Sequence, residues 1–143
     1  MSKYRNFITT RQELCDELIY LKEHKEVKLN DVLPVIMKMT QKRIADVENP
    51  EVDCKLSDVM SYLQMCDSCM ELSLYGNEYV DSLEDFRRFL KEARRDAEMS
   101  IVDIAKKARV SSHIIDKFLY NNGSLSVNQF LSIVNAMGIT LEI

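Results

Sequence analysis

The chain has 143 residues, of which 46% are hydrophobic and 29% charged, and its formal net charge is −4 at pH 7. No apolar run approaches the roughly 20 residues of a membrane span, and no apolar stretch of signal-peptide length opens the sequence. We therefore expect a cytoplasmic protein whose four cysteines are reduced thiols.

Apolar spacing and capping residues predict four helices and a strand in the first part of the chain. The helices are expected over about 11–25, from about residue 30, from Thr40, and over about 56–66, and the strand over 70–74. Gly76 and Asn77 then break the pattern, so a domain boundary is expected here.

The second part repeats this order, and the residues that begin and end its helices are easier to recognise. Capping-box patterns begin helices at Ser82, Ser100 and Ser126, and Ser111 or Ser112 begins a further helix between the last two. Gly138 is expected to end the last of these helices, and residues 139–143 alternate as a closing strand. The predicted organisation is one unit over 1–75, a linker over 76–82 and a second unit over 83–143.

The apolar pattern of residues 39–72 recurs 71 positions later. For example, Leu56 falls on Val127 and Tyr62 on Ile133. Upstream the best shift is 72 positions, which brings Leu14 onto Phe86 and Asp31 onto Asp103. Few residues are identical, so the core pattern is what recurs, and we interpret it as a decayed duplication of one small helical domain. Two such domains in one chain could form a single-chain pseudo-dimer.

Two short helices joined by a tight turn, the second opened by Ser or Thr, are typical of a helix-turn-helix, whose second helix enters the DNA major groove. Residues 90–119, LKEARRDAEMSIVDIAKKARVSSHIIDKFL, resemble the lambda-repressor/Cro-like (XRE) family. Residues 39–74, with the Glu48-Asn49-Pro50 ending of the third helix, resemble its HipB-type antitoxin repressors. The resemblance implies a mainly helical fold of two tandem helix-turn-helix domains, each ending in a strand that could pair with the other, within one chain or between two.

Carried over by position, the resemblance also implies the residues that contact DNA. Those facing base edges are Gln41, Lys42, Ala45, Ser112, His113 and Asp116. Those facing phosphates are Lys38, Thr40, Arg43, Lys106, Lys107, Arg109, Ser111, Lys117, Asn121 and Asn122.

Several positions depart from the family pattern. Leu29 and Ile101 stand where the family places a phosphate-holding Gln, and Pro34 lies inside an expected helix. Lys38 and Arg109 occupy the turn that usually carries Gly, so a positive φ there would cost about 1 kcal/mol. Asp116 brings a negative charge to a position that is usually neutral or basic.

Other kinds of site find little support. Cys66 and Cys69 form a CxxC, but no second CxxC or His at ligand spacing completes a zinc site, so we expect core or surface thiols. No catalytic constellation or glycine-rich phosphate loop is present. We therefore expect no enzyme, metal or cofactor.

The resulting hypothesis is a sequence-specific regulator, a repressor or antitoxin-like protein that binds double-stranded DNA and no membrane. The alternative is a protein-interaction module that keeps the fold without DNA binding and recognises a partner such as a toxin. The acidic first part, net −5 over residues 1–82, and Asp116 favour the alternative. The start Thr40-Gln41-Lys42-Arg43 and the basic 106–117 stretch favour DNA. Association of two chains is left open.

Overall fold

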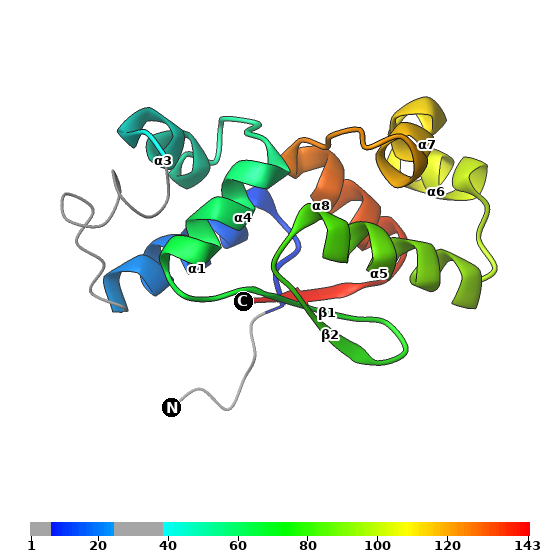
Figure 1. The fold of residues 1–143 in the computed structure, drawn as a ribbon, viewed down its shortest axis with the longest axis horizontal. Coiled ribbons are helices and arrows are strands. Elements are labelled where there is room, and N and C mark those ends of the chain that lie inside the picture. Colours follow the sequence, from blue (N-terminus) through cyan, green and yellow to red (C-terminus); the bar gives the residue numbers. More distant parts are fainter. Residues whose placement is uncertain (1–6, 25–38) are drawn as a thin grey trace.

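The structure is a computed structural model and describes residues 7–24 and 39–143. These residues form seven helices and a three-stranded antiparallel sheet, so the protein is mainly helical, as expected (Figure 1). The elements are α1 (Arg11–His24), α3 (Gln41–Glu48), α4 (Leu56–Met65), β1 (Met70–Ser73), β2 (Asn77–Val80), α5 (Leu83–Asp96), α6 (Ile101–Ala108), α7 (Ser112–Tyr120), α8 (Val127–Ala136) and β3 (Thr140–Glu142). The helix expected from about residue 30 lies outside the described residues.

Hydroxyl side chains begin most of these helices. Ser100 and Ser126 each accept a hydrogen bond from the third helical N–H, and Asp103 and Gln129 accept one in return, so both predicted capping boxes are confirmed. The box predicted at Ser82 is only half formed. Ser82 accepts from the N–H of Asp85, but the Asp85 carboxylate accepts from the N–H of Asp81 instead of that of Ser82.

Two helix ends use the same backbone geometry with different residues. After α8, Gly138 has φ +72°, and the N–H groups of Gly138 and Ile139 donate to carbonyls in the last turn. After α4, Asp67 has φ +52° and begins the same pair of bonds. Both ends are Schellman motifs, which favour glycine at the left-handed position. Gly138 meets that preference and Asp67 does not.

The sheet joins the closing strand of the first predicted unit to the closing strand of the second. Its strand order is β2-β1-β3, and β1 pairs with β3 in antiparallel register, with Glu71 opposite Glu142. We call residues 71 positions apart counterparts, or 72 apart for residues before position 37; Glu71 and Glu142 are therefore counterparts. The two closing strands thus pair within one chain, one of the arrangements that the sequence left open.

The outer edges of the sheet also match. β2, which lies in the segment expected as a linker, pairs Val80 with Met70. On the other edge the N–H of Ile8 donates to the carbonyl of Leu141 at 2.8 Å. Ile8 is the counterpart of Val80, and Leu141 that of Met70. The segment that leads into each half therefore lies beside the closing strand of the other half.

A second reciprocal contact joins the starts of α4 and α8, which meet near the middle of the molecule (Figure 1). The N–H of Leu56 donates to the carbonyl of Leu125 at 3.0 Å, and the N–H of Val127 donates to that of Cys54 at 2.8 Å. Val127 is the counterpart of Leu56, and Leu125 that of Cys54. Such an exchange of bonds is what a local twofold relation between the N-terminal half (residues 7–75) and the C-terminal half (residues 76–143) produces.

One hydrophobic core runs through both halves. It includes Leu14, Leu18 and Tyr62 from the N-terminal half, and Phe86 and Phe130, whose rings lie 4.9 Å apart edge to face, from the other. A unit of about 70 residues would bury only about 60% of its unfolded surface alone, so a shared core stabilises both halves. Among the described residues, none of the helices has both the length and the apolar character that crossing a bilayer demands.

Candidate nucleic-acid interface

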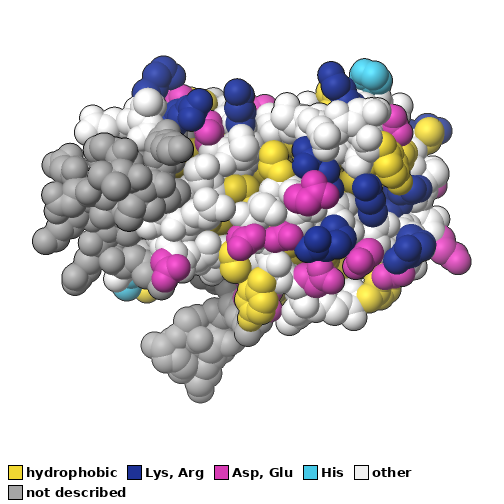
Figure 2. Space-filling view, in the orientation of Figure 1, with side chains coloured by type: hydrophobic (Ala, Val, Ile, Leu, Met, Phe, Trp, Pro, Cys, Tyr) yellow, Lys and Arg dark blue, Asp and Glu magenta, His cyan; other side chains and the backbone are white. Residues whose placement is uncertain are grey.

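Two short helices occupy corresponding places at opposite ends of the molecule. In Figure 1, α3 and α7 both lie on the side away from the sheet, one at each end of the long axis. Lys and Arg side chains project from both ends of this edge in Figure 2. Because α3 and α7 are counterparts, any surface that contacts one helix in a given orientation can contact the other in the twofold-related orientation.

Helix α3 presents a polar face to solvent. Thr40 caps it by accepting from the N–H of Arg43, and Ile44 and Val47 turn into the core. The three residues predicted to face bases are all exposed, namely Gln41, Lys42 and Ala45. The Lys42 ammonium lies 2.9 Å from the carboxylate of Asp46 one turn on, and the Lys42 side chain is 83% exposed. This ion pair is weak because water screens it.

Helix α7 is held in the same way. Ser111 caps it by accepting from the N–H of His113, while Ile115, Phe118 and Leu119 are buried. The residues predicted to face bases are again exposed, namely Ser112, His113 and Asp116. Asp116 stands on this exposed face as an acceptor with a negative charge.

The residues predicted to face phosphates are also on the surface, with one outside the described residues. The exposed ones are Thr40, Arg43, Lys106, Lys107, Arg109, Ser111, Lys117, Asn121 and Asn122. Lys38 falls in the segment that is not described. Arg109 has φ +57° in the turn between α6 and α7, so this non-glycine residue adopts the left-handed conformation that the sequence marked as costly there.

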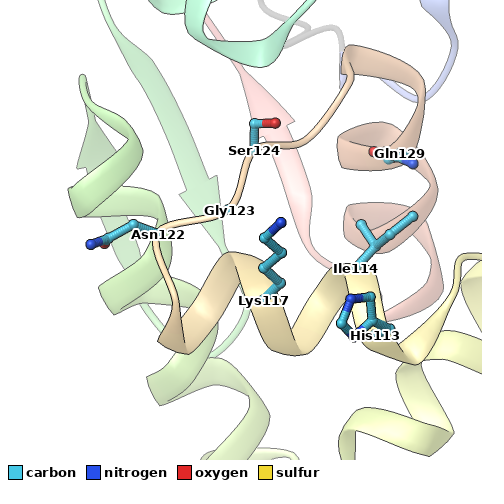
Figure 3. Close-up of a pocket in the computed structure, with 7 residues that line it drawn as sticks. All are labelled: His113, Ile114, Lys117, Asn122, Gly123, Ser124 and Gln129. Atoms are coloured by element: carbon cyan, nitrogen blue, oxygen red, sulfur yellow. The ribbon is translucent and has the colours of Figure 1, made fainter.

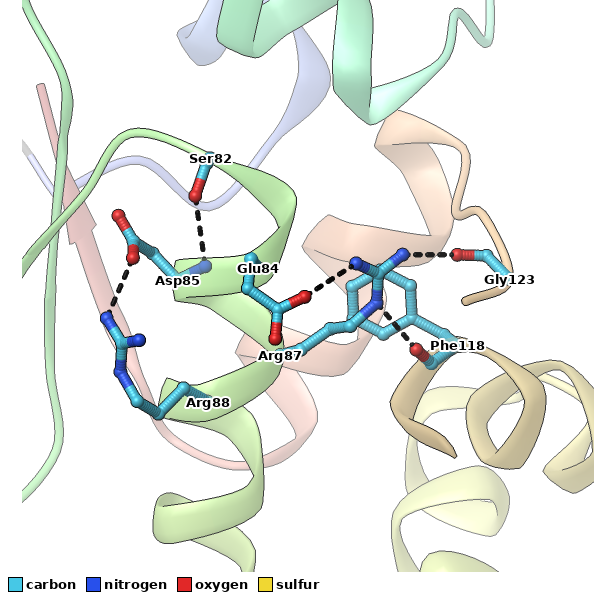
Figure 4. A network of polar contacts seen from close by, with 7 residues as sticks. All are labelled: Ser82, Glu84, Asp85, Arg87, Arg88, Phe118 and Gly123. Atoms are coloured by element: carbon cyan, nitrogen blue, oxygen red, sulfur yellow. Dashed lines mark hydrogen bonds and ion pairs between the residues drawn. The ribbon is translucent and has the colours of Figure 1, made fainter. Parts of the chain in front are cut away.

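Arg87 of α5 anchors the end of α7 and was not singled out by the sequence (Figure 4). Its Nε donates to the carbonyl of Phe118 at 2.8 Å and its Nη2 to that of Gly123 at 2.9 Å. The guanidinium lies 4.8 Å from the centre of the Phe118 ring, and the side chain is only 11% exposed. A charged group that donates to a helix-end carbonyl makes a strong hydrogen bond. Arg87 therefore fixes the position of the C-terminal end of α7.

Arg11 of α1 performs the same task for α3 from a different position. Its Nη2 donates to the carbonyls of Asp46 at 3.0 Å, Asn49 at 3.2 Å and Val52 at 3.2 Å. Val52 is the counterpart of Gly123, so the two arginines bind carbonyls at counterpart positions. The counterpart of Arg87 itself is Cys15, whose thiol donates to the carbonyl of Val47 at 3.4 Å.

A polar cluster behind α3 has no equivalent behind α7. Glu48 accepts hydrogen bonds from the ammonium of Lys22 and from the hydroxyl of Tyr62. Burial, and then the hydrogen bond to Glu48, raise the pKa of the Tyr62 hydroxyl. In the C-terminal half the counterparts of Glu48 and Tyr62 are Leu119 and Ile133, both buried apolar residues.

A hollow of about 510 Å³ opens beside α7, between this helix and the start of α8 (Figure 3). Its lining includes the cation Lys117 together with both polar and apolar surface. The residues around it are His113, Ile114, Lys117, Asn122, Gly123, Ser124 and Gln129. These residues come from α7, the following loop and α8, so both helices shape the hollow.

The cysteines are thiols in the described structure. Cys66 is buried and Cys69 half-buried, and burial raises the pKa of the Cys69 thiol. Burial also raises the pKa of the Cys54 thiol, to about 11. Over residues 7–24 and 39–143, no three His, Cys, Asp or Glu residues come together in a group that could hold a metal ion.

Comparison of the chain with protein-family models, curated protein sequences and solved structures finds no match in any of the three. The functional assignment therefore depends on the residues and contacts of this chain.

Proposed function

We propose that the chain is a sequence-specific regulator of the lambda-repressor/Cro-like kind that binds double-stranded DNA through α3 and α7. The observation that carries this proposal is the reciprocal pairing of the two halves, which leaves two counterpart helices exposed on one side of the molecule. Helix-turn-helix dimers place their recognition helices about 34 Å apart, one turn of B-DNA. A single chain with two such helices would bind DNA without first forming a dimer.

The exposed residues determine what each helix could read. The amide of Gln41 can bond to adenine N6 and N7, and Lys42 can reach guanine once it leaves Asp46. On α7, the Asp116 carboxylate can accept from cytosine N4, and Ser112 and His113 can donate or accept. Because these two sets differ, we expect a DNA site with two unlike halves, in place of the palindrome that a homodimer reads.

The test is binding by the full chain to a pool of random-sequence duplexes, followed by selection and sequencing of the bound fraction. We expect enriched sites with two unlike elements whose centres are about 10 base pairs apart. Gln41→Ala should relax the sequence preference of one element by about 1–3 kcal/mol, whereas Gln12→Ala, an exposed glutamine on α1, should change nothing. The absence of any enriched sequence would contradict the proposal.

A second candidate function is supported by the acidic groups on the same helices. Asp46 neutralises Lys42, and Asp116 stands exposed on α7. Such faces suit a basic protein surface, as in an antitoxin that covers a toxin. Binding to duplex DNA that does not weaken with salt, together with a tight complex with a basic protein co-purified from the native cell, would favour this candidate over the first.

A further inference from the structure

The residues that line the hollow beside α7 differ sharply in charge from the residues at the corresponding positions beside α3. In the C-terminal half the polar residues of the lining are His113, Lys117, Asn122, Ser124 and Gln129. Their counterparts in the N-terminal half are Lys42, Asp46, Glu51, Asp53 and Asp58. Lys117, Asn122, Ser124 and Gln129 thus correspond to four carboxylates, whereas His113 corresponds to a basic residue, Lys42.

We propose that the hollow beside α7 holds a phosphate of the DNA backbone, and that the corresponding positions beside α3 do not. This inference rests on the proposed function. It assigns two roles to the two halves: the C-terminal half anchors the chain to the DNA backbone, and the N-terminal half contributes base contacts with little phosphate binding of its own.

The chemistry of the lining fits a phosphodiester. Lys117 supplies a positive charge, and the side chains of Asn122, Ser124 and Gln129 carry N–H or O–H groups that can donate to phosphate oxygens. The Gln129 carbonyl already accepts from the N–H of Ser126, so its Nε2 is the end that remains for an anion. The hollow is open enough, at about 510 Å³, to admit a phosphate with its sugar.

Close packing of the loop maintains this shape. A Cβ at Gly123 would lie 2.9 Å from Cγ of Lys117 and 3.0 Å from its carbonyl carbon, so a larger residue would push the loop away from α7. Arg87 holds the Gly123 carbonyl from behind at 2.9 Å. The counterpart of Gly123 is Val52, so the loop after α3 does not make the same approach.

The acidic counterparts act in the opposite direction. The carboxylate of Asp46 is engaged with Lys42, and that of Asp53 accepts from the N–H of Asn128 at the start of α8. Glu51, the counterpart of Asn122, is exposed. A backbone phosphate would meet four like charges there.

The first test removes the proposed anchor. The affinity of the full chain for a random-sequence duplex is measured by fluorescence anisotropy over a series of salt concentrations. Lys117→Gln is expected to weaken binding roughly five- to tenfold at low salt, and to reduce the slope of log affinity against log salt by about one. Arg95→Gln is the matched control: it also removes one exposed positive charge, at the end of α5, and should leave the slope unchanged.

The second test builds the anchor into the other half. The double variant Glu51→Asn and Asp58→Gln introduces the residues of the C-terminal half and is expected to tighten binding several-fold. Thermal melting of each variant confirms that the fold is retained. The inference is overturned if the native chain binds with a salt slope that Lys117→Gln leaves unchanged while Arg43→Gln lowers it. If the native chain shows no salt-dependent binding at all, the proposed function fails as well.

Discussion

The two halves hold their exposed helix with the same interaction placed at different positions. In the C-terminal half Arg87 reaches the carbonyl of Gly123, and in the N-terminal half Arg11 reaches the counterpart carbonyl of Val52 from one helical turn earlier. Cys15 stands where Arg87 would be expected. What is preserved is the location of a guanidinium beside the helix end, whereas the residue that supplies it has moved. Such exchanges remove sequence identity between halves that keep the same contacts.

A second contrast lies in the interior. Behind α3 the cluster of Lys22, Glu48 and Tyr62 satisfies its own hydrogen bonds, whereas behind α7 the counterparts of Glu48 and Tyr62 are apolar. Partly buried ion pairs add little net stability, but removing one partner is costly because the other charge is left unpaired. The N-terminal half is therefore more sensitive to single substitutions in this region than the C-terminal half.

The largest effect is expected from the arginines. Arg87→Ala should lower the free energy of unfolding by about 3 kcal/mol, because two buried carbonyls lose a charged donor and Phe118 loses a packed neighbour. Arg11→Leu should cost about 2 kcal/mol for the same reason. Urea unfolding followed by circular dichroism measures both.

Moving the guanidinium of the N-terminal half from position 11 to position 15 tests whether the two arginines play the same role. In the double variant Arg11→Leu and Cys15→Arg, the N-terminal half receives the arrangement of the C-terminal half. We expect most of the stability lost in Arg11→Leu to return, leaving the variant within about 1 kcal/mol of the native chain. If the double variant is less stable than Arg11→Leu alone, Arg11 and Arg87 do not hold their helices in equivalent ways.

The polar cluster should give the next largest effect. Glu48→Ala leaves Lys22 without its acceptor and Tyr62 with only the carbonyl of Leu18, at 3.3 Å, and should cost about 2 kcal/mol. The triple variant Lys22→Met, Glu48→Leu and Tyr62→Phe should instead lie close to the native stability. Chemical denaturation of the two variants side by side separates the cost of an unpaired group from the value of the cluster, and equal losses in both would contradict this account.

Substitutions at the left-handed residues after α4 and α8 should change the free energy of unfolding by less, and in opposite directions. Asp67→Gly should raise stability by up to about 1 kcal/mol, because Asp67 is held at φ +52°. Gly138→Ala should lower it by about 1 kcal/mol at φ +72°. Differential scanning calorimetry resolves shifts of this size, and a destabilised Asp67→Gly variant would show that the Asp67 side chain has a stabilising role of its own.

The last effect is absent at neutral pH and appears only as the pH rises. Burial raises the pKa of the Cys54 thiol from 9.0 to about 11, and its counterpart Leu125 does not titrate. Between these values the folded chain keeps a proton that the unfolded chain has lost, so this contribution to stability is complete below pH 9 and disappears as pH rises through 11. Stability measured from pH 8 to 11 should therefore fall less steeply in Cys54→Leu than in the native chain. Parallel pH profiles for the two proteins would argue against a buried thiol.

The sequence predicted the local features better than the long-range ones. The caps at Ser100 and Ser126 depend on residues three positions apart, so the pattern alone identifies them. The repeated closing strands indicated only that β1 and β3 could pair, within one chain or between two, and the structure pairs them within one chain. Arg11 and Arg87 escaped notice because their acceptors are backbone carbonyls, which every residue carries. The strand at 77–80 escaped because its pairing partner is set by the fold and its own pattern is short.

For the interface, the sequence pointed to exposed positions on α3 and α7, and the described ones are exposed. Whether they contact DNA stays a prediction. The hollow beside α7 could not be foreseen, because it depends on how the loop around Gly123 packs against Lys117. The acidic counterparts were present in the sequence, but their significance appears only once the two halves are compared position by position.

The exchange of edge segments between the halves also bears on how the chain folds. Ile8 meets Leu141, Glu71 meets Glu142 and Leu56 meets Leu125, so these contacts close loops of many tens of residues. Closing such loops costs conformational entropy before any contact repays it, and it slows the search for the native state. Helices and the β1–β2 hairpin can form early from local signals, but the pairing of β1 with β3 must wait for both halves. Folding is therefore expected to end with a single late step that completes the two halves together.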